Sequence, residues 1–132
     1  KTIQSQSTSN PCSIAQKAAV AALNGGDETV QHMVHAFHKR HDFVVERLHD
    51  IAGINVIPAD GTFYIFPNVQ AIIEQKGFKN DVEFAEKLLE ETGVALVPGS
   101  AFGTGGSIRI SFATSMNTLR DAMDRLQKFA EQ

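Results

Sequence analysis

Residues 108–113 have the sequence Ile-Arg-Ile-Ser-Phe-Ala, and this alternation is typical of a half-buried β-strand. Successive side chains of a strand point to opposite faces of the sheet. Arg109, Ser111 and Ala113 are therefore expected on one face, and Ile108, Ile110 and Phe112 on the other. The glycine-rich residues 98–106 come directly before this strand, so we expect them to form the loop that leads into it.

Helix caps, turns and periodicity predict further elements on the N-terminal side of this strand and one helix after it. Ser9-Asn10-Pro11 has the polar residue and the proline that favour a helix start, and Asn80 with Glu83 resembles a capping box. Predicted helices cover residues 11–23, 27–52, 80–91 and the end of the chain after Ser115, and predicted strands cover residues 54–57, 62–66, 94–97 and 107–113. The order α-α-β-β-α-β-β-α indicates an α+β domain, in which a small, mostly antiparallel sheet of about four strands is packed with helices.

The composition excludes several classes of protein. The chain has 132 residues, 42% of them hydrophobic and 20% charged, which is typical of one globular domain. Its net charge of −3 argues against nucleic-acid binding, and no apolar run approaches the roughly 20 residues that span a membrane. Cys12 is the single cysteine, which favours a reducing, cytoplasmic location. The polar residues 1–10 do not begin with methionine, so we expect them to be the end of a truncated upstream element, and residues 11–132 to be the domain.

Two motifs that could bind a metal or a phosphate are better explained as structure. His32, His35, His38 and His41 recur every three residues, so their directions rotate around a helix with 3.6 residues per turn and do not converge on a metal. We expect His41 to pack in the core and predict no metal site. Residues 103–106 lead into a strand and not into a helix N-terminus, which predicts an inter-strand connection and not a phosphate-binding loop.

Arg109 is the candidate binding residue. It interrupts an apolar strand with a permanent charge, and a planar guanidinium pairs through two hydrogen bonds with a carboxylate. A surface arginine or a structural ion pair remains an alternative. Phe63 and Tyr64 belong to the predicted strand 62–66, and alternation would send one of them to the core and the other to a pocket.

Four segments of the chain together resemble the C-terminal third of class I aminotransferases, in particular the bacterial aspartate aminotransferases. These are Ser5-Gln6-Ser7-Thr8-Ser9-Asn10-Pro11, Gly61-Thr62-Phe63-Tyr64-Ile65-Phe66-Pro67, Val97-Pro98-Gly99-Ser100-Ala101-Phe102-Gly103 and Ile108-Arg109-Ile110-Ser111-Phe112-Ala113. The order and spacing of the segments also match, and the resemblance covers essentially the whole chain.

The resemblance implies that residues 11–132 are the small domain of a homodimeric enzyme whose large domain holds pyridoxal phosphate on a lysine. It implies that Arg109 grips the α-carboxylate of an amino acid or a 2-oxo acid and that Phe63 borders the substrate. It places Ser9 and Asn10 near the cofactor pocket at the subunit boundary. Pro98, Gly99 and Phe102 would belong to the loop that shapes the edge of the small domain.

Two departures from the family pattern limit these expectations. Another branch carries an arginine at the position of Ser5, so aspartate can be the substrate here only if upstream residues bind its second carboxylate. None of the seven lysines has the Ser-x-Ser-Lys context of the family, so we expect the chain alone to be inactive. The alternatives are a stand-alone module that binds carboxylate ligands through Arg109, or a dimerising piece without catalysis. The alanine-rich face of the first helix also predicts self-association.

Overall fold

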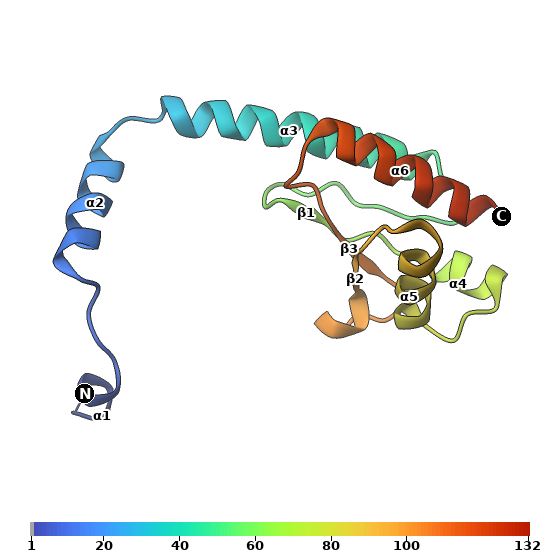
Figure 1. Ribbon diagram of the computed structural model, residues 1–132, viewed down its shortest axis with the longest axis horizontal. Coiled ribbons are helices and arrows are strands. Elements are labelled where there is room, and N and C mark those ends of the chain that lie inside the picture. The colour runs from blue at the N-terminus through green and yellow to red at the C-terminus, as the bar shows by residue number, and fades with distance from the viewer. Residues whose placement is uncertain (1) are drawn as a thin grey trace. The chain divides into compact units, whose positions relative to one another are not determined.

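The computed structural model describes residues 2–132 and divides them into two compact units, residues 2–34 and 35–132 (Figure 1). Lys1 lies outside the described residues. Three helices begin in the first unit: α1 (Thr2–Ser7), α2 (Ser13–Asn24) and α3 (Glu28–His49). All residues from 2 to 34 are exposed. The expectation that Pro11 opens the second of these helices is wrong, because Cys12 is still extended, with ψ 155°, and α2 begins at Ser13.

The second unit contains the sheet. After α3 follow β1 (Tyr64–Ile65), α4 (Gln70–Lys76), α5 (Asp81–Thr92), β2 (Val97–Pro98), the 3-10 turn η1 (Gly99–Phe102), β3 (Ile108–Ser111) and α6 (Met116–Glu131). The sheet has the order β1-β3-β2, and both pairs are antiparallel. The α+β class and the antiparallel sheet are therefore confirmed, with β3 as the central strand.

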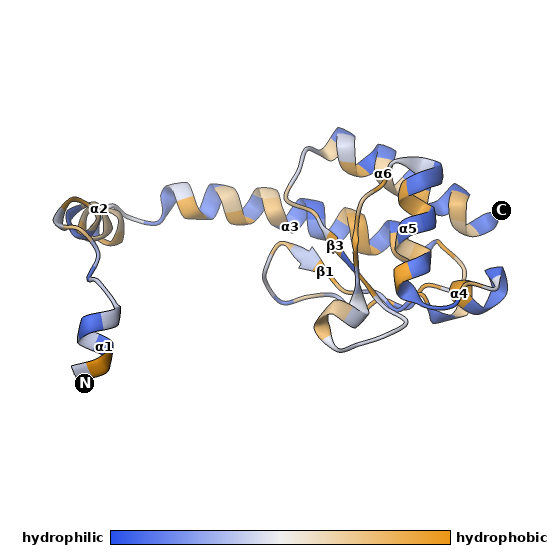
Figure 2. Ribbon diagram, turned by 60° about the horizontal axis from the view of Figure 1, so that its bottom comes forward, coloured by the Kyte–Doolittle hydropathy of each residue, from blue (hydrophilic) through white to orange (hydrophobic). Residues whose placement is uncertain are grey.

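The alternation predicted for residues 108–113 is confirmed by burial. Ile108, Ile110 and Phe112 are buried, while Arg109 is half-buried and Ser111 exposed. Residues from α3, α5 and α6 complete the core, and Figure 2 shows the hydrophobic and hydrophilic sides of these helices. The largest fully buried side chains of the three helices are Val44, Leu48, Phe84, Leu88, Met123 and Leu126.

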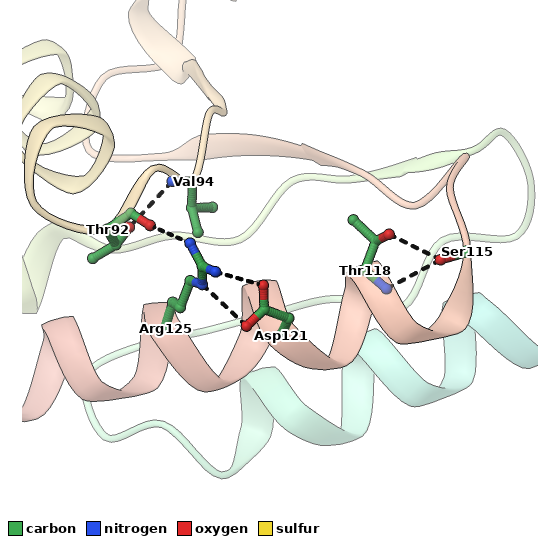
Figure 3. A network of polar contacts seen from close by, with 6 residues as sticks. All are labelled: Thr92, Val94, Ser115, Thr118, Asp121 and Arg125. Carbon is green, nitrogen blue, oxygen red and sulfur yellow. Dashed lines mark hydrogen bonds and ion pairs between the residues drawn. The ribbon is translucent and has the colours of Figure 1, made fainter.

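Polar contacts fix α6 against its neighbours. Arg47 of α3 pairs with Asp124, with 2.8 Å between Nη1 and Oδ1, and α6 lies alongside α3 within this unit. Figure 3 shows Arg125 of α6 donating from Nη1 to the carbonyl oxygen of Thr92 at 2.7 Å, while its Nη2 lies 2.8 Å from Asp121. The cation therefore meets the C-terminal carbonyls of α5, where the helix dipole favours positive charge.

The caps predicted at Asn80 and Ser115 are confirmed. The Asn80 side chain accepts hydrogen bonds from the amides of Val82 and Glu83. Glu83 accepts one from the amide of Lys79, one residue before the cap, and not from that of Asn80 as in a capping box. Ser115 accepts a hydrogen bond from the amide of Thr118 and caps α6. Caps are local, and the sequence therefore predicts them well.

The predicted strand 54–57 is wrong, and the sheet has three strands instead of about four. Ile54 and Val56 are buried, as the alternation indicates, but Asn55 makes a single bridge to Asn68. Pro58 follows and has no N–H to continue a ladder. The alternation of residues 54–57 therefore reflects the burial of Ile54 and Val56 and not a strand paired along its length in the sheet.

Two helices were not predicted from the sequence: α1 (Thr2–Ser7) in the first unit and, in the second unit, α4. Helix α4 covers only seven residues, and Val69 precedes it without any side-chain cap, so no start signal is present. Buried Ile72 and Ile73 hold it to the core, and Gly77 ends it in a left-handed conformation with φ 70°. The predicted order α-α-β-β-α-β-β-α is corrected to α-α-α-β-α-α-β-β-α. Among the described residues, no helix is long and apolar enough to span a membrane.

Candidate functional site

Arg109 lies in the middle of the sheet. Val97 of β2 is its partner on one side, and on the other side β3 pairs with β1 through Tyr64↔Ser111 and Ile65↔Ile110. Cross-strand partners share a face of the sheet. Tyr64 therefore lies on the same face as Ser111 and Arg109, and this face is not covered by the core.

The guanidinium of Arg109 lies over two aromatic rings. Its Cζ lies 4.9 Å from the ring centroid of Tyr64 and 4.4 Å from that of Phe102. Both distances are within the range of a cation–π interaction. Such contacts do not need the N–H donors of the guanidinium, which remain available for hydrogen bonds.

Two further rings complete an aromatic cluster, which we define as Phe63, Tyr64, Phe66 and Phe102. The ring centroids of Phe63 and Tyr64 are 4.5 Å apart, and those of Phe66 and Phe102 are 6.0 Å apart. Phe63 is 46% exposed and Phe102 is 49% exposed. The cluster is thus an accessible apolar surface around a fixed cation.

The expectation that Phe63 or Tyr64 enters the core is wrong. Tyr64 is half-buried, Phe63 is exposed, and their rings touch. The predicted strand 62–66 shortens to two residues because Thr62 has a positive φ of 69° and bends the chain just before it. The core position in this segment belongs to Ile65 instead.

Within the part of the chain that the structure describes, Arg109 has no carboxylate partner. None of the ion pairs or side-chain hydrogen bonds within residues 2–132 involves it. The alternative of a structural ion pair is therefore contradicted for the described part of the chain. A half-buried arginine with its hydrogen bonds unused is suited to bind an anion from outside.

The turn η1 carries Phe102 and is tightly packed. The amide of Gly99 donates to the carbonyl of Ser107 at 2.7 Å, and the amide of Thr104 donates to the carbonyl of Gly99 at 3.1 Å. A Cβ at position 99 would collide with the carbonyl oxygen of Thr104 and lie 2.7 Å from that of Ser107. Position 99 therefore accepts only glycine, which gives a steric reason for the glycine in the Pro98-Gly99 motif.

Asp81 was not predicted from the sequence as a site residue. It is 2% exposed, and its Oδ2 accepts a hydrogen bond from the amide of Ser100 at 2.7 Å. Burial raises the pKa of this carboxyl, but hydrogen bonds from Ser100 and from the amide of Gly106 outweigh burial, so that the pKa is lowered overall. An acidic residue after a helix cap is common, and nothing in the sequence relates it to residues 100–106.

Ser9 and Asn10 lie between α1 and α2 in the first unit, and both are exposed. No side-chain hydrogen bond of either residue occurs in the described range. Phe63 and Arg109 belong to the second unit, whereas Ser9 and Asn10 belong to the first.

His41 is packed as expected. Its side chain is 13% exposed, and its ring centroid lies 5.8 Å from that of Phe112. Nε2 accepts a hydrogen bond from the amide of Ala59 at 3.0 Å, so Nδ1 carries the proton and donates to Asp42. This bond, and to a lesser extent the nearby His38, lowers the pKa of Asp42 despite some desolvation. In residues 2–132 no three metal-ligating side chains come together.

The lysines of the described range do not form a buried amine site. Lys87 pairs with Glu90 at 2.8 Å, which raises its pKa, and Nζ of Lys76 lies 5.1 Å from the ring centroid of Phe129. Every lysine from residue 2 onward is exposed or half-buried. A nucleophilic lysine requires a desolvated setting, which these side chains lack.

A groove of 320 Å³ lies between α6 and residues 93–96. Its lining is mainly aliphatic and includes Leu96, Ile110 and Ala122. Its one cation, Arg125, is already bonded to Asp121 and Thr92. Arg109 does not line this groove, and the groove offers an anion no free donor of comparable charge.

Comparisons with known proteins agree with this fold. The family model for aminotransferase class I and II matches residues 1–126. Aspartate aminotransferase of Bacillus subtilis is 43% identical over 98% of the chain, and asparagine–oxo-acid transaminase of Streptococcus mutans is 45% identical over 98%. The crystal structure of the aspartate aminotransferase from Rhizobium meliloti superposes with a TM-score of 0.90 at 38% identity and covers 98% of the chain.

The chain spans about a third of the length of these relatives: 33% of the two sequences and 34% of the Rhizobium meliloti chain. The match nevertheless covers nearly all of the 132 residues. This chain belongs to the class I and II aminotransferase family.

Proposed function

We propose that this chain is the C-terminal, substrate-carboxylate-binding part of a pyridoxal-phosphate-dependent aminotransferase of the aspartate type. The whole protein would move an amino group between an amino acid, with aspartate as the proposed donor, and a 2-oxo acid. One observation carries the proposal: the Arg109 guanidinium lies over the rings of Tyr64 and Phe102, and no carboxylate of the described residues pairs with it. Relatives named aspartate aminotransferase support the choice of substrate.

Arg109 would perform the same task in both halves of the reaction. The amino acid and the 2-oxo acid both present an α-carboxylate, and a guanidinium binds it through two parallel N–H···O bonds. Such anchoring orients the bond at Cα and lowers the entropic barrier to its cleavage. Phe63, which is exposed beside Tyr64, would border the substrate.

Pyridoxal phosphate, when bound, supplies the electron sink for this chemistry. The described side chains do not fit a complete site for it, because no lysine from residue 2 onward is buried. Ser9 and Asn10 are exposed hydroxyl and amide groups that could contribute hydrogen bonds at its border. We therefore expect the 132-residue chain to leave the absorbance of added pyridoxal phosphate unchanged and to show no transamination. A lysine-dependent absorbance change with turnover would refute this expectation.

The remaining parts of the proposal concern the whole protein. Residues 11–132 would be the small domain, residues 1–10 the end of an upstream element, and the missing large domain would hold the cofactor. A homodimer is proposed because the first unit leaves apolar side chains uncovered, among them Ile14 at 80% and Leu23 at 86% exposure. A cytoplasmic location remains a prediction from the sequence.

The test compares two arginine-to-lysine variants in the full-length protein that contains this chain. Arg109→Lys keeps the charge but loses the two-pronged pairing, so kcat/KM should fall about ten- to hundredfold for both the amino acid and the 2-oxo acid. Arg120→Lys is the matched control, because Arg120 also lies near a ring, 6.0 Å from the centroid of Phe43. Equal activity of the two variants would refute the proposed role of Arg109.

A further inference from the structure

We infer that Asp81 is a positioning residue for the Arg109 guanidinium, because it fixes the turn that carries Phe102. The inference rests on the proposed function, in which Arg109 binds a substrate carboxylate. Asp81 itself does not touch Arg109. It would act through Ser100, η1 and Phe102, and each of these steps has a contact in the structure.

The first step is the attachment of the loop to Asp81. Oδ2 of Asp81 accepts the amide hydrogen of Ser100 at 2.7 Å and thereby links positions 19 residues apart. The Ser100 side chain and the Gly106 amide also contribute to the lowered pKa of this carboxyl group. The bond from the Ser100 amide therefore ties the start of η1 to the first turn of α5.

The second step is the strength of this attachment. Asp81 is 2% exposed, and within residues 2–132 no Lys, Arg or His forms an ion pair with it. A buried charge is strongly unfavourable unless hydrogen bonds satisfy it. Here the donor is the Ser100 amide, and the carboxylate lies in the first turn of α5, where the helix dipole favours negative charge. Moving the loop would take this donor away from a buried carboxylate.

The third step leads from the loop to Arg109. Phe102 is the last residue of η1, and its ring centroid lies 4.4 Å from Cζ of Arg109. Because Phe102 is 49% exposed, core packing does not hold its ring. The backbone of η1 must hold it, and that backbone depends on the bond from Ser100 to Asp81 and on those of Gly99.

A purely structural role for Asp81 at the start of α5 makes a different prediction, and Glu83 provides the control. Glu83 lies in the same first turn and accepts the amide of Lys79 at 2.6 Å, but no hydrogen bond of the described residues joins its side chain to η1. Removing either carboxylate weakens the start of α5. Only removal of Asp81 should change the surroundings of Arg109.

The experiment uses NMR on the ¹⁵N-labelled 132-residue chain, with maleate as the carboxylate probe. Ring currents of Tyr64 and Phe102 should displace the Arg109 Nε–Hε signal, which is assigned by its loss in Arg109→Lys. In Asp81→Ala we expect this signal to move toward the value of free arginine. Maleate affinity should fall about two- to tenfold, because a mobile side chain loses more freedom on binding. Glu83→Gln should change neither quantity.

The proposed function and the positioning role fail in different ways. If maleate does not shift the Arg109 signal in the wild type, the proposed function fails at this residue. If Asp81→Ala leaves the signal without maleate unchanged, or if Glu83→Gln moves it equally, the positioning role is refuted. Should Asp81→Ala not fold, Asp81→Asn replaces it, since it keeps the size and one acceptor oxygen. We expect this variant to move the signal in the same direction by a smaller amount, and an unmoved signal overturns the inference.

Discussion

The substitution Gly99→Ala tests most directly how the loop beside Arg109 is built. The added Cβ would collide with the carbonyl oxygen of Thr104 and lie 2.7 Å from the carbonyl oxygen of Ser107. Both atoms belong to the backbone, so no side-chain rotation relieves the contact. The loop must move, and the bonds from Gly99 to Ser107 at 2.7 Å and from Thr104 to Gly99 at 3.1 Å are then weakened or lost.

The magnitude follows from these two effects. Overpacking costs about 1–3 kcal/mol, and each lost hydrogen bond about 0.5–1.5 kcal/mol. The free energy of unfolding should therefore fall by about 2–6 kcal/mol, which is a large part of the roughly 5–15 kcal/mol typical of a domain. Urea denaturation followed by far-UV circular dichroism measures this change.

Two other glycines serve as controls for the backbone. Gly103 has φ 80°, and no atom lies within 4 Å of the point that a Cβ would occupy, so Gly103→Ala should cost only the left-handed strain of about 1–2 kcal/mol. Gly61 has neither a positive φ nor a close neighbour, and Gly61→Ala should be nearly neutral. A Gly99→Ala variant that is no more destabilised than Gly103→Ala would refute this account of the loop.

Three further predictions concern charge and surface. Because the pKa of Asp81 is lowered in the folded state, its stabilising contribution is present above the unfolded pKa of about 4 and is lost as the pH falls through the lower folded value. Acid titrations monitored by circular dichroism should therefore show a flatter stability loss for Asp81→Ala than for the wild type, and parallel curves would contradict this. Arg125→Met removes the cation bonded to the carbonyl of Thr92 and should lower the unfolding free energy by about 1 kcal/mol, whereas Arg120→Met should have a smaller effect in the same urea titration. The 132-residue chain should self-associate through the apolar side chains of α2, and Leu23→Asp should reduce the mass measured by light scattering; a wild-type monomer at high concentration would disprove this.

The local features of the fold could be predicted from the sequence. The caps at Asn80 and Ser115 depend on neighbouring residues only, and the alternation of residues 108–113 identified both the buried face of β3 and the exceptional position of Arg109. Local sequence patterns gave wrong or missing predictions for elements whose structure depends on tertiary contacts. Residues 54–57 have the burial pattern of a strand without its ladder, and α4 is held by tertiary burial of Ile72 and Ile73 without a cap.

The α+β class, the central strand and the presence of a cation within that strand follow from local patterns in the chain, because periodicity and caps act over a few neighbouring residues. The surroundings of that cation follow from tertiary contacts alone. Tyr64, Phe102 and Asp81 come from three separate elements, and their contacts with Arg109 or with η1 join positions far apart along the chain, such as Asp81 and Ser100. Such proximity depends on the register of β1 on β3 and on the docking of η1 against α5, which no local pattern encodes.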